Sequence, residues 1–133
     1  MVEFSIAAVV FLTAMFAVIE FGRALWVHNA LADAARRGAR YASLHSANDI
    51  EMVRNVVVYG DEDGGTQPLI PNLTTGNVSV NYSNYAVNGG TVSVSITEYQ
   101  FQFVIPIIGT TITMPSYTTT LTGESVGIVP EPI

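Results

Sequence analysis

The sequence has no cysteine and no lysine among its 133 residues, and only 12% of its residues are charged. Without cysteine the chain cannot form a disulfide, a thiolate metal site or a cysteine nucleophile. Its strong cations are arginines, four of which fall within residues 23–40, and its net charge is −6. Nucleic-acid-binding surfaces need clustered lysine and arginine on a basic domain. We therefore expect neither thiol chemistry nor a nucleic-acid partner.

The sequence also lacks the motifs of common catalytic sites. It contains no glycine-rich phosphate loop and no Gly-x-Ser-x-Gly elbow. Its two histidines, His28 and His45, would lie roughly 25 Å apart along one helix, which is too far for a shared metal ion. Glu98 is an isolated acid for which no acid–base partner can be named. We therefore expect no enzymatic activity and no cofactor.

A run of three acids, Asp61-Glu62-Asp63, precedes two glycines. Clustered carboxylates before glycine resemble part of a calcium-binding loop, but the full EF-hand spacing and its closing glutamate are missing. We predict that residues 61–63 form a solvated acidic loop that holds no metal ion.

The first third of the chain predicts one uninterrupted helix that reaches about Ser46. Residues 4–19 contain no charge, no proline and no glycine. After His28 the apolar residues recur every three or four positions, which is typical of an amphipathic helix. A helix of ~45 residues is roughly 65 Å long. Because a domain of this size cannot cover that length, we expect the apolar half, residues 1–27, to leave the globule.

The apolar half is long enough to cross a bilayer if Glu20 and Arg23 pair with each other or lie near an interface. A cleaved secretory signal is disfavoured, because Glu3 makes the start acidic instead of basic. The arginines near the span all follow it, so a count of positive charges would place the domain in the cytoplasm. A short basic leader, removed ahead of Met1, would resolve this conflict.

Residues 28–133 predict one globular domain of class α+β. The strands alternate apolar and polar residues and form an antiparallel meander of about three strands. The amphipathic half-helix is the one element long enough to cover the apolar face of this sheet. The domain divides into the amphipathic half-helix at 28–46, a short helix at about 49–59, a sheet at about 77–125 and an extended tail at 126–133.

Four local features of the predicted sheet stand out. Residues 88–90, Asn-Gly-Gly, predict a hairpin turn. The apolar alternation changes phase at Glu98, which predicts either a bulge or a sheet covered on both faces. Residues 104–109 are too apolar for a free loop, so we expect them to pack on the helix or on a neighbouring molecule. Pro115 predicts a broken ladder or an edge strand.

Several N-terminal pieces together resemble the signature of TadE-like proteins, pilin-like subunits of the tight-adherence branch of the type IV pilus superfamily. The pieces are Val2-Glu3-Phe4, Ile19-Glu20-Phe21-Gly22-Arg23, Asn29-Ala30 and Ala34-Ala35-Arg36-Arg37-Gly38-Ala39-Arg40-Tyr41-Ala42. The resemblance implies a type IV pilin-like fold. It also implies cleavage by a prepilin peptidase after a glycine, with Met1 at the processing end. The family's glutamate usually occupies the fifth mature position, whereas here it is the third residue.

The resemblance further implies a structural subunit of an extracellular Tad-type filament. Before assembly the protein would be anchored in the bacterial or archaeal inner membrane. The pilus assembly machinery would then add it to a filament made of copies of the same protein. Two alternatives remain: a minor pilin or pseudopilin that primes or tips a filament of other pilins, and a single-pass anchored binding module that does not polymerise.

We infer the assembly residues from the energetics of moving the apolar half-helix out of lipid and into a filament. That transfer gains little hydrophobic energy, so close packing and satisfied charges must stabilise the filament. Glu3 would be costly in a bilayer unless paired. It either lies at the interface, where the helix dipole favours it, or pairs with the N-terminal amine of a neighbouring subunit. The expected assembly residues are Glu3, Phe4, Glu20, Arg23, Ala7, Ala8, Ala14, Ala17 and Gly22.

Overall fold

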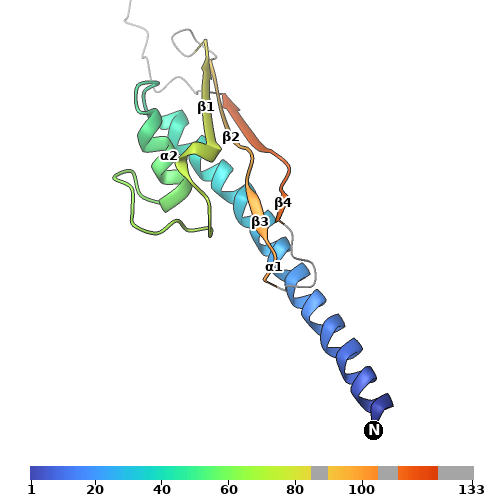
Figure 1. The fold of residues 1–133 in the computed structure, drawn as a ribbon. Helices are drawn as coiled ribbons and strands as arrows, with labels where there is room; N and C mark the ends of the chain where they lie inside the picture. The colour runs from blue at the N-terminus through green and yellow to red at the C-terminus, as the bar shows by residue number, and fades with distance from the viewer. Residues whose placement is uncertain (85–89, 105–110, 123–133) are drawn as a thin grey trace, which may run out of the picture.

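The computed structural model describes residues 1–84, 90–104 and 111–122. A long helix runs away from a small α+β domain, as Figure 1 shows. This architecture confirms the predicted pilin-like fold class. The elements are α1 (Val2–Leu44), α2 (Ile50–Tyr59), the 3-10 helix η1 (Thr75–Asn77), β1 (Val78–Ser83), β2 (Thr91–Ile96), β3 (Gln100–Gln102), β4 (Thr111–Thr113) and β5 (Tyr117–Thr122).

Helix α1 is continuous over 43 residues and only its second half is buried in the domain. Residues 1–19 are exposed apart from the half-buried Ala8. The domain first covers α1 at Glu20, which is buried, and then again from Val27 onward, while Trp26 between them is 55% exposed. The buried face beyond Val27 is rich in alanine, which allows α1 to lie close to the rest of the domain.

Helix α2 begins and ends where the sequence predicts. Its C-cap, Gly60, has a φ of 80°, a left-handed conformation that glycine adopts without strain. Asp49 occupies the N-cap position, but its side chain makes no capping hydrogen bond and instead accepts one from the Ser46 hydroxyl at 3.1 Å. The apolar side of α2 contributes Val53 and Val57, both fully buried, to the core beside α1.

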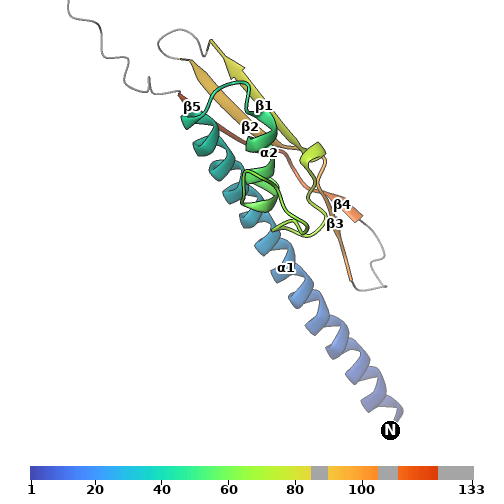
Figure 2. The ribbon, with the colours of Figure 1, turned by 90° about the vertical axis from the view of Figure 1, so that its left-hand side faces the viewer.

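The sheet has two parts. Strands β1, β2 and β5 form a three-stranded antiparallel sheet in the order β1-β2-β5, and β3 pairs with β4 in a separate two-stranded ribbon. Every second residue of β2 is buried, as the alternation predicts, namely Val92, Val94 and Ile96. Figure 2 shows the sheet lying along the upper part of α1. The core is therefore the layer between α1, α2 and this sheet.

The phase change at Glu98 is a matched break in two strands, so the bulge, one of the two predicted alternatives, is wrong. Ile96 pairs with Tyr117, and Gln100 pairs with Thr113, so each strand has three residues between the two pairs. No extra residue is inserted, which is what a bulge requires. Glu98 turns the chain with a φ of 57°. Strands β3 and β4 therefore continue the register of β2 and β5 in a new direction.

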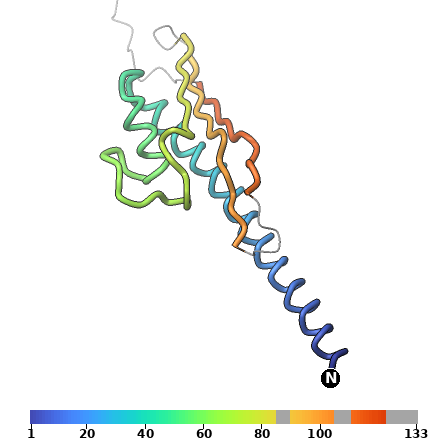
Figure 3. The backbone as a smooth tube through the Cα atoms, viewed as in Figure 1, coloured from blue at the N-terminus to red at the C-terminus, as the bar shows by residue number. Residues whose placement is uncertain are grey.

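Because of this change of direction, β3 and β4 extend closer to the N-terminal end of α1 than β1 and β2 do, as the tube in Figure 3 shows. The ribbon turns a buried side chain, Phe101, toward the helix. Three expectations from the sequence lie outside the described residues: most of the hairpin turn at 88–90, nearly all of the apolar run at 104–109, and the tail at 126–133.

Helix α1 packs closely against the rest of the domain at Gly38. A Cβ atom there would lie 2.3 Å from Val57 Cγ2 on α2 and 3.2 Å from Val94 Cγ1 on β2. We expect Gly38→Ala to lower the free energy of unfolding, because overpacking costs about 1–3 kcal/mol and outweighs the helix propensity of alanine. Denaturant unfolding of the detergent-solubilised chain measures this.

Gly22→Ala is the matched control on the same helix. A Cβ atom at Gly22 would meet nothing within 4 Å. We expect this change to raise stability by up to about 1 kcal/mol, the difference in helix propensity. Equal stabilisation by both substitutions would contradict the close packing at Gly38.

Candidate functional site

The bare half-helix, residues 2–19, is the most unusual surface of this protein. Its large apolar side chains point into solvent, with Phe4 78% and Phe11 67% exposed. The most apolar window of 18 residues in α1 has a mean hydropathy of 2.3, and none of it is buried. Among the described helices α1 is long and apolar enough to cross a membrane, judged by length and composition. An exposed apolar surface of this extent marks a site that contacts a membrane or another protein.

The small residues predicted for helix contacts lie on this accessible part of α1. Ala7, Ala14 and Ala17 are exposed, and Ala8 is half-buried. Gly22 has open space around its Cα. Within the described part of the chain, nothing packs against this row, so the backbone there is open to close approach by another helix.

Glu3 lies near the free end of the helix. One of its carboxylate oxygens is 4.0 Å from the Met1 amine, and both groups are fully exposed. An exposed pair at this distance adds little to the stability of one molecule. In the isolated molecule Glu3 is therefore available for a stronger partner.

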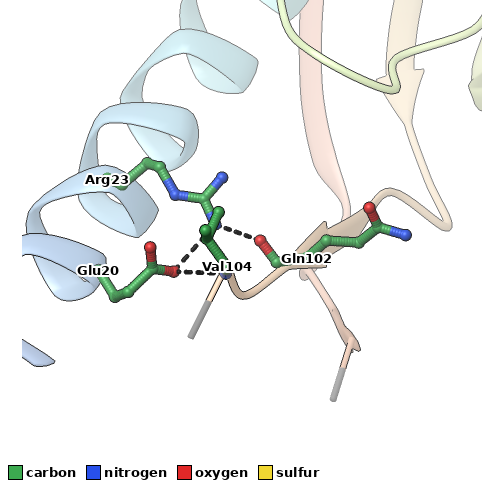
Figure 4. Close-up of polar contacts among 4 residues, drawn as sticks. All are labelled: Glu20, Arg23, Gln102 and Val104. Carbon is green, nitrogen blue, oxygen red and sulfur yellow. Dashed lines mark hydrogen bonds and ion pairs between the residues drawn. The ribbon is translucent and has the colours of Figure 1, made fainter. Parts of the chain in front are cut away.

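The Glu20–Arg23 junction, shown in Figure 4, joins α1 to the end of β3. Arg23 Nη2 lies 2.9 Å from Glu20 Oε2, so the pair predicted from the sequence is present. The same carboxylate oxygen accepts the backbone N–H of Val104 at 3.3 Å. Arg23 also donates to the backbone carbonyl of Gln102. Its guanidinium lies 4.4 Å from the ring centroid of Phe101.

This arrangement provides hydrogen-bond partners for backbone groups at the end of β3. The pairing of β3 with β4 stops at Gln102, so the backbone groups that follow have no strand partner. Although both residues are exposed, the Gln102 carbonyl accepts a hydrogen bond from a side chain of α1 and the Val104 N–H donates one to a side chain of α1. Glu20 and Arg23 provide one acceptor and one donor from the helix. Sequence analysis found the two side chains but missed Gln102 and Val104, because backbone partners leave no pattern in side-chain identity.

The acidic loop, residues 61–63, is held in place by the two helices. Glu62 Oε2 accepts a hydrogen bond from the Tyr41 hydroxyl at 2.6 Å, and its backbone carbonyl accepts one from Asn55 at 3.0 Å. The Asp63 N–H bonds to Asp61 Oδ1 at 3.0 Å. Among the described residues, no group of three or more histidine or acidic side chains could hold a metal ion.

The fold and the bare half-helix together define a protein of pilin-like α+β architecture. Comparison with protein families adds a more specific finding: residues 1–40 match the TadE-like protein family, as the N-terminal pieces predict. This similarity connects the chain with proteins of the Tad pilus. No curated protein and no solved structure matches the chain.

The Glu20–Arg23 junction predicts a selective loss of stability. Glu20→Ala removes the acceptor for Arg23 and for the Val104 N–H. We expect the melting temperature of the detergent-solubilised chain to fall by roughly 3–8 °C. Glu51→Ala is the control, since Glu51 makes an equally spaced pair with Arg54 on α2 but is 74% exposed. We expect it to change the melting temperature little. Equal effects would show that the junction contributes no more than a surface pair.

The Tyr41–Glu62 contact predicts a pH dependence. The hydrogen bond to the Glu62 carboxylate, with some burial, raises the pKa of Tyr41 from its ordinary 10.0 to about 12. Because the folded state holds this proton more tightly, the stabilisation is complete below pH 10 and is lost as the pH rises from 10 through 12.

Ultraviolet titration of tyrosinate measures this shift. Subtracting the curve of Tyr41→Phe from that of the unmodified chain isolates one group, which we expect to titrate near pH 12. In Glu62→Gln the same group should titrate closer to pH 10. A midpoint at 10 in the unmodified, folded chain would contradict the contact.

Proposed function

We propose that this protein is a structural subunit of an extracellular Tad-type filament and that it assembles through its bare half-helix. The main support is one observation: the part of the domain that the structure describes leaves residues 2–19 uncovered. Water is an unfavourable environment for that surface. The protein therefore needs two apolar environments in turn, a membrane before assembly and neighbouring helices afterwards.

The length of the bare half-helix fits the membrane stage of this proposal. From Val2 to Glu20 the helix rises by about 27 Å, at about 1.5 Å per residue, and the hydrocarbon core of a bilayer is about 30 Å thick. Trp26 lies about 9 Å further along and is 55% exposed. Tryptophan is enriched at membrane interfaces. We infer that Glu20 and Arg23 lie at the boundary of the inner membrane, with the domain beyond it.

The assembled stage replaces lipid by the helices of other subunits. Both environments are apolar, so the exchange is favourable only if the helices pack closely and their charges are paired. Ala7, Ala14 and Gly22 would allow close approach, and Glu3 would pair with the amine of a neighbouring copy. Processing by a prepilin peptidase and extraction by the pilus machinery complete the proposal, supported by the match of residues 1–40.

The Glu20–Arg23 junction has a mechanical role in this proposal. It fixes the end of the β3–β4 ribbon to α1 where the bare part of the helix begins. The ribbon then cannot slide over the apolar residues, so the length of helix available to other subunits stays constant. A filament built from identical subunits requires this constancy, because every copy must offer the same surface.

A second role within the same system is a minor subunit that primes or tips a filament of other pilins. The family match favours a place in the Tad system and is equally compatible with either role. Subunit stoichiometry in purified filaments separates the two. A bulk subunit would be the most abundant protein along the filament, whereas a minor one would be present in a few copies.

The proposal predicts that Glu3→Ala separates assembly from folding. The variant should remain a folded, membrane-held monomer, because the Glu3 side chain is exposed and contacts nothing in the described part of the domain. We expect at least a tenfold loss of sheared filament by electron microscopy. The control is Glu51→Ala, which removes an exposed acid from α2 and should leave filament yield unchanged. Normal yield from Glu3→Ala would remove Glu3 from the mechanism, and absence of filaments from the unmodified chain would contradict the function itself.

A further inference from the structure

A groove of about 390 Å³ lies on the α1 face and is lined by four charged residues, Asp33, Arg36, Arg37 and Arg40. We call it the arginine groove. Three of the five arginines of an acidic chain are gathered here. Counting Asp33 against them, three positive charges minus one negative charge leave the groove with a net charge of +2.

The three arginines differ in how far they are already engaged. Arg36 pairs with Asp33 at 3.0 Å, and both side chains are 70% exposed. Arg37 donates to the backbone carbonyls of Val56 and Val57 at 3.3 and 3.5 Å. Arg40 is exposed, and in the described ranges no acid lies within 4.0 Å of it. Apart from Asp33, no carboxylate in the described part of the chain therefore pairs with the arginines of the groove.

Distance excludes the lipid surface as that anion. Arg36 follows Glu20 by 16 residues, which is about 24 Å along the helix. Charges in salt at physiological strength are screened beyond about 8 Å. If Glu20 lies at the membrane boundary, lipid headgroups are too far from the groove to be its partner.

The chain itself presents a matching anion in the acidic loop. Tyr41 and Asn55 hold Glu62, which fixes the loop while Asp61 and Asp63 remain exposed. No cation pairs with either aspartate in the part of the chain that the structure describes. The sequence has no lysine. In a contact between copies of this chain, arginine is therefore the strong cation available to these carboxylates.

We propose that the arginine groove of one subunit binds the acidic loop of a second copy. Arginine binds carboxylates through two parallel hydrogen bonds, which gives the contact a defined geometry. The groove and the loop lie near one another, because Arg37 contacts the carbonyls of Val56 and Val57, and Tyr41, one turn further along α1, holds Glu62. When each copy uses its groove for one neighbour and its loop for another, the contact is head-to-tail and repeats along an open helical assembly. The inference rests on the proposed function and adds a contact between domains to the packing of the half-helices.

Charge reversal tests the contact in filaments. Arg36→Glu with Arg40→Glu, and separately Asp61→Arg with Asp63→Arg, should each reduce filament yield at least tenfold. Combining all four substitutions should restore it, because the charges are complementary again. Arg54→Glu is the control, since Arg54 pairs with Glu51 on α2, and it should leave the yield unchanged. Normal yield from both reversed pairs would overturn the inference.

Disulfide trapping tests the same contact without requiring a filament, and the absence of native cysteine removes background. Two differently tagged copies, one with Arg36→Cys and one with Asp61→Cys, are produced together in one membrane and oxidised. We expect a dimer containing both tags and no dimer of either copy with itself. Absence of the mixed dimer would overturn the inference. A mixed dimer without filaments would retain the contact and reject the proposed function, so the two failures are distinguishable.

Discussion

One constraint governs this structure: the apolar side chains on residues 2–19 must be shielded from water. No element in the described part of the chain packs on them, although the same helix is well buried from Val27 onward. A surface of this kind is unfavourable in water, so the molecule needs a membrane or another protein. This requirement is the reason why we propose that an otherwise ordinary α+β domain takes part in assembly.

The boundary between the covered and bare parts of α1 is set by polar chemistry. Glu20 and Arg23 interrupt the apolar stretch, and the end of β3 needs partners for its backbone groups. The polar side chains and the end of the strand satisfy each other at the same point of α1, where the described part of the domain ends. A purely apolar helix would offer no such marker, and the ribbon would have no preferred position along it. The buried Glu20 therefore marks the point on α1 from which the helix is bare toward its N-terminus.

Local patterns predicted much of the fold. The periodicity of α1, the short helix and the alternation in β2 all reflect one chain segment facing one environment, so the sequence contains them directly. The break at Glu98 shows the limit. The phase change was visible in the sequence, but a bulge and a matched break differ only in the residues of the partner strand, near Pro115. Register is a relation between two segments, and neither segment determines it alone.

The sequence by itself determined that a long helix has an apolar half, that Glu20 and Arg23 can pair, and that residues 61–63 form an acidic loop. Each depends on neighbours a few positions apart. Only the tertiary structure joined that pair to Gln102 and Val104, which lie 79 residues from Arg23 and 84 from Glu20. It also anchored the acidic loop to Tyr41. These contacts join segments that are far apart in the sequence. They depend on how the whole chain packs, which local sequence patterns do not determine.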